Sequence, residues 1–133
     1  MMAEIQGKQV EVPEKLSGRK VVKVLPLDYL NTAHARSHHR LEVFAFKGVR
    51  CVVPDCPCEG AFMAVTHEGR DETRGFHYDV YTADFKLMTV DHHIPKADGG
   101  GDELENKFPM CERHNSKKGR KPPEVFYARF GKS

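Results

Sequence analysis

The first half of the chain carries one strand-like and one helix-like pattern of apolar positions. Residues 20–27 are rich in Val and Leu but contain Pro26, which is typical of a short strand or a sheet edge. From residue 29 to 46, apolar or small side chains recur at steps of three and four residues, and Gly48 follows as a stop. We therefore expect a strand and then an N-terminal amphipathic helix over residues 29–46.

Alternation with a period of two dominates the middle of the chain. It predicts strands over residues 60–66, 75–82 and 85–90, with a polar hairpin loop at residues 67–72 between the first two. Three consecutive glycines within residues 96–102 then predict an irregular loop. A few antiparallel strands together with helices indicate a fold of the α+β class.

The C-terminal part predicts a second helix and a short end. The helix should begin near Met110 and end by Gly119, because glycine is a natural C-terminal cap. Pro122 and Pro123 stop regular structure, and residues 124–130 add an apolar closing segment. Neither an internal repeat nor a domain linker is present, so we expect a small single domain over residues 1–133.

Composition narrows the class of protein. With 133 residues and 39% hydrophobic residues, the chain has the length of one domain whose small core needs extra fastening. No apolar run reaches the length of a membrane helix and the charged N-terminus does not resemble a secretory signal, so we expect a cytoplasmic protein with no membrane partner. In that reducing compartment, four cysteines favour metal ligation over disulfides.

Charge is almost balanced overall but not along the chain. The 21 Lys and Arg residues face 19 Asp and Glu residues, and this balance alone does not predict a nucleic-acid partner. One segment near the C-terminus is nonetheless strongly basic. Its cations, with no acidic residue among them, are Arg113, Lys117, Lys118, Arg120 and Lys121.

Cysteine and histidine fall into two close clusters that suit a zinc ion. Cys51, Cys56 and Cys58 form the first, and Cys111 with His114 forms the second at the predicted second helix. Zn²⁺ prefers four tetrahedral sulfur and nitrogen ligands, which one pair from each cluster would supply. We expect a structural zinc held by Cys51, Cys56, Cys111 and His114. Cys58 is the alternative, although one residue between Cys56 and Cys58 would strain ligation by both.

Candidate catalytic groups stand where the last predicted strand ends. There Asp91 precedes His92 and His93, and Asn106 and Asn115 follow downstream. A carboxylate oxygen can hold Mg²⁺ while a neutral imidazole accepts a proton from water. Strand alternation aims His92 and His93 at opposite faces, so only one of them can serve a given site.

Residues 90–118 resemble the HNH endonuclease family, the ββα-metal or His-Me finger nucleases, in its small, stand-alone, zinc-knuckle-containing form. The motif positions in order are Asp91-His92, Ile94-Pro95, Gly99-Gly100, Asn106, Cys111 with His114, Asn115 and Lys118. With the first cysteine pair as a zinc knuckle, the resemblance covers residues 51–121 and implies a zinc-clipped ββα-metal module there. It leaves residues 1–50 as a strand-and-helix extension and residues 122–133 as a closing segment.

The resemblance assigns a role to each polar residue of the motif. His92 would be the general base. Asp91 and Asn115 would be ligands of one catalytic divalent metal, which is Mg²⁺, Mn²⁺ or Ni²⁺. Asn106 would hold the loop so that the base points correctly.

Two further histidines are candidates for a supporting role. His93 would pack, contact a residue of the site from behind, or contact the substrate backbone. His77 alternates with the apolar positions of its strand and could approach the site.

The family implies a metal-dependent endonuclease that hydrolyses phosphodiester bonds. Double-stranded DNA is the expected substrate, with phosphate contacts from the basic segment. A stand-alone member of this size is typical of phages and mobile elements, which would place it in the host cytoplasm. The alternative is a zinc-stabilised module that binds nucleic acid without cutting it, and a monomer and a homodimer are both open.

Overall fold

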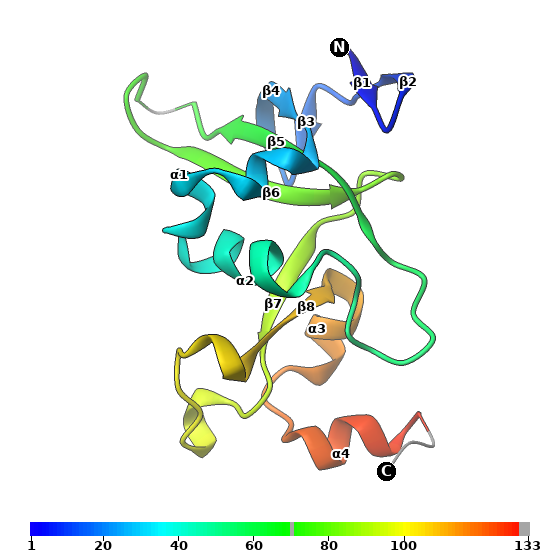
Figure 1. Ribbon diagram of the computed structural model, residues 1–133, viewed down its shortest axis with the longest axis vertical. Coiled ribbons are helices and arrows are strands. Elements are labelled where there is room, and N and C mark those ends of the chain that lie inside the picture. Colours follow the sequence, from blue (N-terminus) through cyan, green and yellow to red (C-terminus); the bar gives the residue numbers. More distant parts are fainter. Residues whose placement is uncertain (70, 131–133) are drawn as a thin grey trace.

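The computed structural model describes residues 1–69 and 71–130, in which a β-rich upper part stands over a lower part of one hairpin and short helices (Figure 1). The strands are β1 (Met2–Ile5), β2 (Lys8–Glu11), β3 (Lys15–Leu16), β4 (Arg19–Leu25), β5 (Gly60–His67), β6 (Phe76–Thr82), β7 (Met88–His92) and β8 (Lys107–Cys111). The α-helices are α1 (Ala33–Arg36), α2 (His39–Lys47), α3 (Glu112–Lys118) and α4 (Pro123–Ala128). Short 3-10 helices are η1 (Leu27–Asn31), η2 (Lys96–Asp98) and η3 (Leu104–Asn106). None of these described helices combines the length and the apolar character needed to cross a bilayer.

A four-stranded antiparallel sheet in the order β3-β4-β5-β6 forms the upper part. Its inner strand β5 is buried on both faces, because Met63 packs into one hydrophobic cluster and Phe62 and Ala64 pack into another. Successive side chains of a strand point to opposite faces, so an uninterrupted apolar strand needs a core on each side. The N-terminal strands cover one face, and α2 with the lower part covers the other.

The lower part is the antiparallel hairpin β7–β8 with α3 packed on it and α4 following (Figure 1). Its register places Asp91 opposite Phe108 and His92 opposite Lys107. Two strands followed directly by a helix is the arrangement that the resemblance implies. With its separate helices and antiparallel sheets, the domain is of the expected α+β class.

One lysine fastens α2 to this hairpin. Lys47 Nζ donates hydrogen bonds to the backbone oxygens of Leu104 (2.6 Å) and Lys107 (2.7 Å), and it lies 3.8 Å from the centre of the Phe108 ring. A charge-assisted hydrogen bond is stronger than a neutral one. The end of α2 is therefore held against the strand that pairs with His92.

The prediction of an N-terminal helix is wrong. The chain begins with strands, and β1 and β2 are joined at Gln6 and Gly7, whose positive φ angles suit a two-residue hairpin turn. The helix predicted over residues 29–46 is divided into η1, α1 and α2. Thr32 and His38 adopt extended backbone, and the Thr32 side chain caps α1, so the apolar spacing continues while the helix stops and restarts.

The three strands predicted in the middle of the chain are present. The observed β5 and β6 differ from their predicted bounds by one residue, whereas β7 begins at Met88 because Phe85 has a φ of 67° in a turn. The apolar closing segment forms helix α4. Two parts of predicted segments, Arg70 in the polar loop and residues 131–133 at the end, lie outside the described residues.

Candidate metal centre and catalytic site

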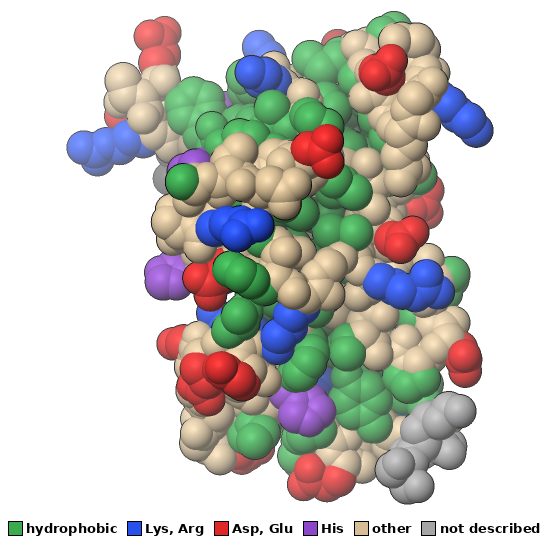
Figure 2. Space-filling view, in the orientation of Figure 1, with side chains coloured by type: hydrophobic (Ala, Val, Ile, Leu, Met, Phe, Trp, Pro, Cys, Tyr) green, Lys and Arg blue, Asp and Glu red, His purple; other side chains and the backbone are tan. Residues whose placement is uncertain are grey.

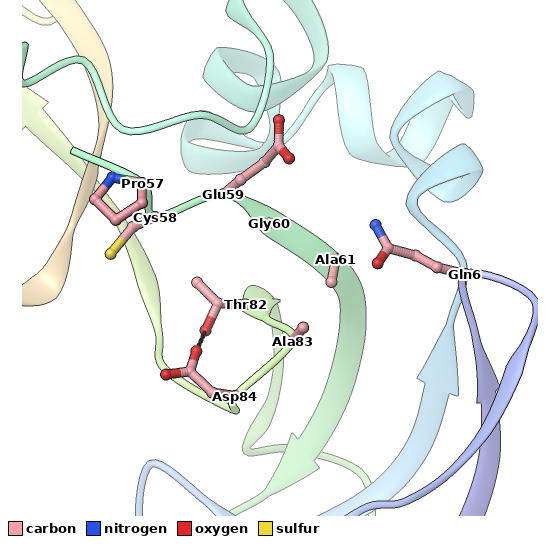
Figure 3. Close-up of a pocket in the computed structure, with 9 residues that line it drawn as sticks. All are labelled: Gln6, Pro57, Cys58, Glu59, Gly60, Ala61, Thr82, Ala83 and Asp84. Atoms are coloured by element: carbon pink, nitrogen blue, oxygen red, sulfur yellow. Dashed lines mark hydrogen bonds between the residues drawn. The ribbon is translucent and has the colours of Figure 1, made fainter. Parts of the chain in front are cut away.

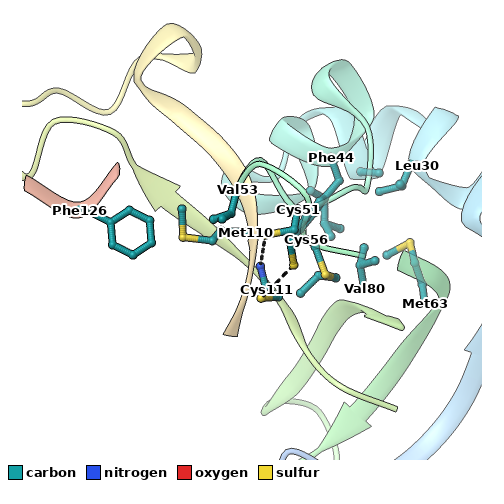
Figure 4. Close-up of a cluster of buried hydrophobic side chains, with 13 residues drawn as sticks. Leu30, Phe44, Cys51, Val53, Cys56, Met63, Val80, Met110, Cys111 and Phe126 are labelled. Atoms are coloured by element: carbon teal, nitrogen blue, oxygen red, sulfur yellow. Dashed lines mark hydrogen bonds between the residues drawn. The ribbon is translucent and has the colours of Figure 1, made fainter. Parts of the chain in front are cut away.

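Three cysteines come together in the interior (Figure 4), and one histidine lies beside them. The sulfur atoms of Cys51, Cys56 and Cys111 and a ring nitrogen of His114 all lie within 4.8 Å of one another, and the four side chains are buried. Cys56 Sγ is 3.9 Å from Cys111 Sγ, which is 3.2 Å from His114 Nδ1. Ligands around a tetrahedral zinc ion lie about 3.5–3.8 Å apart, given the usual bond lengths. The cluster is therefore consistent with one zinc ion.

The local structure of the chain turns these ligands inward. The loop of residues 51–58, which carries the first cysteine cluster, folds back so that the backbone N–H of Cys51 donates to the backbone oxygen of Cys58 (3.0 Å). Burial raises the pKa of the Cys51 thiol to about 12, and the N–H of Cys111, which donates to the Cys51 sulfur (3.3 Å), opposes this effect. Burial, together with neighbouring positive charges, lowers the pKa of His114. A neutral imidazole is the form that binds metal.

Cys58, the alternative ligand, is not one of the four mutually close ligands, although its thiol interacts with those of Cys56 and Cys111. It is partly exposed and lines a hollow of about 370 Å³ at the start of β5 (Figure 3). The charged side chains around this hollow are Glu59 and Asp84, both acidic, so it is unsuited to a phosphate. The structure thus brings together the four ligands preferred from the sequence and leaves Cys58 without an assigned role.

Asp91 is buried where β7 meets α3, and its two carboxylate oxygens differ in their surroundings. Oδ1 lies 3.2 Å from Lys118 Nζ, whereas Oδ2 is enclosed and has no hydrogen-bond partner among the described residues. Burial raises the pKa of Asp91, and the charge of Lys118 opposes this effect. An enclosed carboxylate oxygen without a partner is unfavourable. Oδ2 is therefore available to a cation.

Asn115 is oriented by a short hydrogen-bond chain. Its Nδ2 donates to Thr89 Oγ1 (2.7 Å) and to the backbone oxygen of Val90 (3.3 Å). The Thr89 hydroxyl in turn donates to the oxygen of Met110 (2.7 Å), so it can only accept from Asn115. These two hydrogen bonds determine which atom of the Asn115 amide is Nδ2 and hold its orientation. Asn115 Oδ1 is left without a hydrogen-bond partner in the described part of the chain.

The donor set fits a hard divalent cation. Asp91 and Asn115 line a hollow of about 240 Å³ together with His92, Lys96 and Arg120. Mg²⁺ and Mn²⁺ take carboxylate and amide oxygens and fill their remaining positions with water or phosphate oxygens. Asp91 Oδ2 and Asn115 Oδ1 are oxygens of this kind.

His92 is held by a carboxylate that the sequence did not indicate. Its Nε2 donates to Asp102 Oδ1 over 2.8 Å, and Lys96 Nζ lies 3.1 Å from the same oxygen. The hydrogen bond from His92, followed by that from Lys96, lowers the pKa of Asp102. Because a carboxylate only accepts, Nε2 carries a proton, and in the neutral imidazole Nδ1 is then the acceptor nitrogen. In the sequence, the only indication of this contact is that Asp102 stands directly after the three glycines of the loop.

Lys118 lies inside the protein rather than with the other basic residues. Its side chain is fully buried, and its ammonium donates to the backbone oxygens of His92 (3.0 Å) and His93 (3.1 Å) besides pairing with Asp91. The end of β7 is thereby fixed on α3. This burial is incompatible with the phosphate contact expected of Lys118, whereas the other four cations of the basic segment are exposed.

Asn106 holds the loop that follows His92. Its Oδ1 accepts from the N–H of Ile94 (2.9 Å), and its Nδ2 donates to the oxygens of Ile94 (3.1 Å) and Gly101 (2.9 Å). Gly100 lies so close that a Cβ there would collide with the Ile94 oxygen. Asn106 therefore contacts backbone, as expected for a structural residue of this motif.

The two supporting histidines have different surroundings. His93 packs between the rings of Phe108 (5.5 Å between centroids) and Tyr127 (6.1 Å). His77 pairs with Glu68 Oε1 (2.9 Å) next to the loop that connects β5 and β6. The structure therefore places His93 beneath the site and does not bring His77 to it.

Comparison with known proteins gives one family. Residues 75–121 match the sequence profile of the family described as HNH endonuclease. The match contains β6, the β7–β8 hairpin and α3, while α2 and the first cysteine pair precede it. No curated protein and no solved structure matched the chain significantly.

Removing one ligand of the Cys/His cluster should remove zinc and weaken the fold. We expect Cys111→Ala to hold less than about half an equivalent of zinc and to melt at a lower temperature, because metal binding contributes to folding. Cys58→Ala loses a thiol that is not one of the four mutually close ligands and should keep about one equivalent and melt close to wild type. Metal analysis and thermal unfolding measure both effects. Equal zinc content in the two variants would contradict the assignment.

Proposed function

Because the chain contains an HNH endonuclease domain at residues 75–121 and is therefore a phosphodiester hydrolase, we propose that it is a metal-dependent endonuclease acting on DNA. His92 is the general base, and Asp91 and Asn115 hold a single catalytic divalent cation. One observation carries this proposal. Two oxygens without hydrogen-bond partners and one imidazole meet in the same hollow.

The imidazole acts on the attacking water. His92 Nδ1 accepts a proton from this water as its oxygen attacks the phosphorus, while Asp102 holds the proton on Nε2. The bond from phosphorus to the 3′ oxygen then breaks. Asp91 and Asn115 would hold a divalent cation, which would supply positive charge against the negative charge that develops as the bond breaks.

Three residues position these groups without touching substrate. Lys118 holds the carboxylate of Asp91, Thr89 holds the amide of Asn115, and Asn106 holds the loop after His92. Reacting groups must be placed to a fraction of an ångström for efficient catalysis. The hydrogen bonds described above supply that placement before substrate binds.

Exposed cations on helix α3 and just after it support a DNA backbone as the partner. They are Arg113, Lys117, Arg120 and Lys121. Arg120 lines the catalytic hollow, and Lys117 and Lys121 line a neighbouring one of about 620 Å³ with Arg129. Contacts to phosphates position a double-stranded substrate without reading its sequence. On the face seen in Figure 2, by contrast, acidic and basic side chains are interspersed.

Loss of the base should abolish cutting but not folding. We expect His92→Ala to slow nicking of supercoiled plasmid at least about 100-fold with Mg²⁺, Mn²⁺ or Ni²⁺, at an unchanged melting temperature. His77→Ala, which removes a histidine far from the hollow, should cut like wild type. Wild type and His92→Ala that leave equal amounts of intact plasmid with every metal would favour the non-catalytic binding module instead.

Removing the charge of Asp102 should impair turnover rather than binding. An amide at this position can donate to Nε2 and so favour the tautomer that protonates Nδ1. We expect Asp102→Asn to lower kcat about tenfold or more, while KM for DNA stays equal or falls because a negative charge is lost. Asp98→Asn, on the same loop and exposed, is the matched control. Equal kcat for both variants would show that the Asp102 contact is not used.

A further inference from the structure

A second hollow adjoins the catalytic one, at the junction of the β7–β8 hairpin with α2. It measures about 310 Å³. Besides His92, the side chains that line it are His39, Arg40, Val90, Lys96, Asp102 and Lys107. Val90, His92 and Lys96 line both hollows, so the two are neighbours along the same edge of the hairpin.

Lys107 is the unusual member of this lining. It is paired with His92 in the antiparallel register, which puts both side chains on one face of the hairpin. Only 6% of Lys107 is exposed, yet within residues 1–69 and 71–130 its ammonium has neither a hydrogen-bond nor an ion-pair partner. Lys107 Nζ is not among the enclosed polar atoms that lack a partner, so the aliphatic stem is buried while the ammonium reaches the water of the hollow. This cation is therefore available to an anion that enters the hollow.

The other charges around the hollow leave it positive. Arg40, in the first turn of α2, lines the hollow while its guanidinium lies 3.3 Å from Asp79 Oδ1, and the neighbouring His39 is exposed. Asp102 is the one carboxylate of the lining, and it is already shared by Lys96 and His92. Lys107 therefore meets no free negative charge among the groups that line the hollow.

We propose that this hollow binds a backbone phosphate of the DNA strand being cut, next to the scissile phosphate, with Lys107 as its main contact and Arg40 as a second cation. The inference rests on the proposed nuclease function and extends it. The cut DNA strand then runs from α2 past His92 toward Arg120. Since α2 precedes the matched residues 75–121, the substrate site extends beyond the HNH domain.

The salt dependence of binding to a short DNA duplex tests this site, measured by fluorescence anisotropy without added divalent cation. Each phosphate contact contributes close to one unit to the slope of log K against log salt. We expect Lys107→Met to weaken binding about fivefold to tenfold at 0.1 M salt and to lower the slope by about one. Its melting temperature should stay close to that of wild type, because methionine keeps the buried aliphatic stem of the side chain.

Lys8→Met, which removes an exposed lysine from β2, is the matched control and should keep the wild-type slope. Lys107→Met with the affinity and slope of Lys8→Met would overturn the inference while wild-type plasmid cutting leaves the proposed function standing. A lower melting temperature with an unchanged slope would show that the ammonium is structural and would overturn it as well. Wild type that neither binds nor cuts DNA would overturn both proposals.

Discussion

One buried ammonium group organises the catalytic end of the molecule. Lys118 reaches from the last turn of α3 beneath the end of β7, where three oxygens surround it: Asp91 Oδ1 and the backbone oxygens of His92 and His93. Enclosing a charge costs several kcal/mol unless it is paired and hydrogen-bonded. Because one side chain contacts both the carboxylate proposed to bind metal and the backbone of the proposed base, strand and helix cannot shift separately.

The helix that carries Asn115 is short and is fastened at both ends. A helix of seven residues has little stability of its own. Cys111 and His114 tie its first turn to the cysteine knuckle, and Lys118 ties its last turn to β7. Asn115 lies between these two anchors, so its amide faces Asp91 without help from a large core. A small domain with few apolar residues gains from such specific fastening.

The features that the sequence predicted are those set by local spacing and residue type. The cluster of Cys51, Cys56, Cys111 and His114 could be predicted from the close spacing of two ligand pairs, and alternation located β5 and β6. The roles proposed for Asp91, His92 and Asn115 come from their order in the HNH motif. The breaks in the helix predicted over residues 29–46 could not be predicted. The apolar periodicity continues through Thr32, whereas capping by the Thr32 side chain decides where one helix ends and the next begins.

The contacts that the sequence did not reveal are those made by charged side chains across the fold. Lys118 lies in a run of basic residues and looked solvent-exposed, because burial of an ammonium depends on partners that only tertiary packing supplies. Asp102 reaches His92 across a glycine-rich loop whose conformation no periodicity describes. Lys107 follows Asn106 and had no distinguishing neighbour, yet strand register sets it beside the imidazole. Asp102 thus lies 2.8 Å from the proposed base, and Lys118 lies 3.2 Å from the proposed metal ligand Asp91.

A divalent cation between Asp91 and Asn115 is the element on which the proposed chemistry depends, and Mn²⁺ binding to the zinc-loaded protein measures it directly by electron paramagnetic resonance. Wild type should bind about one Mn²⁺ per chain, and Asn115→Ala should bind it at least about tenfold more weakly. Asn31→Ala, an exposed amide on η1, should match wild type. Wild-type affinity in Asn115→Ala, or no Mn²⁺ binding by wild type, would contradict the metal site.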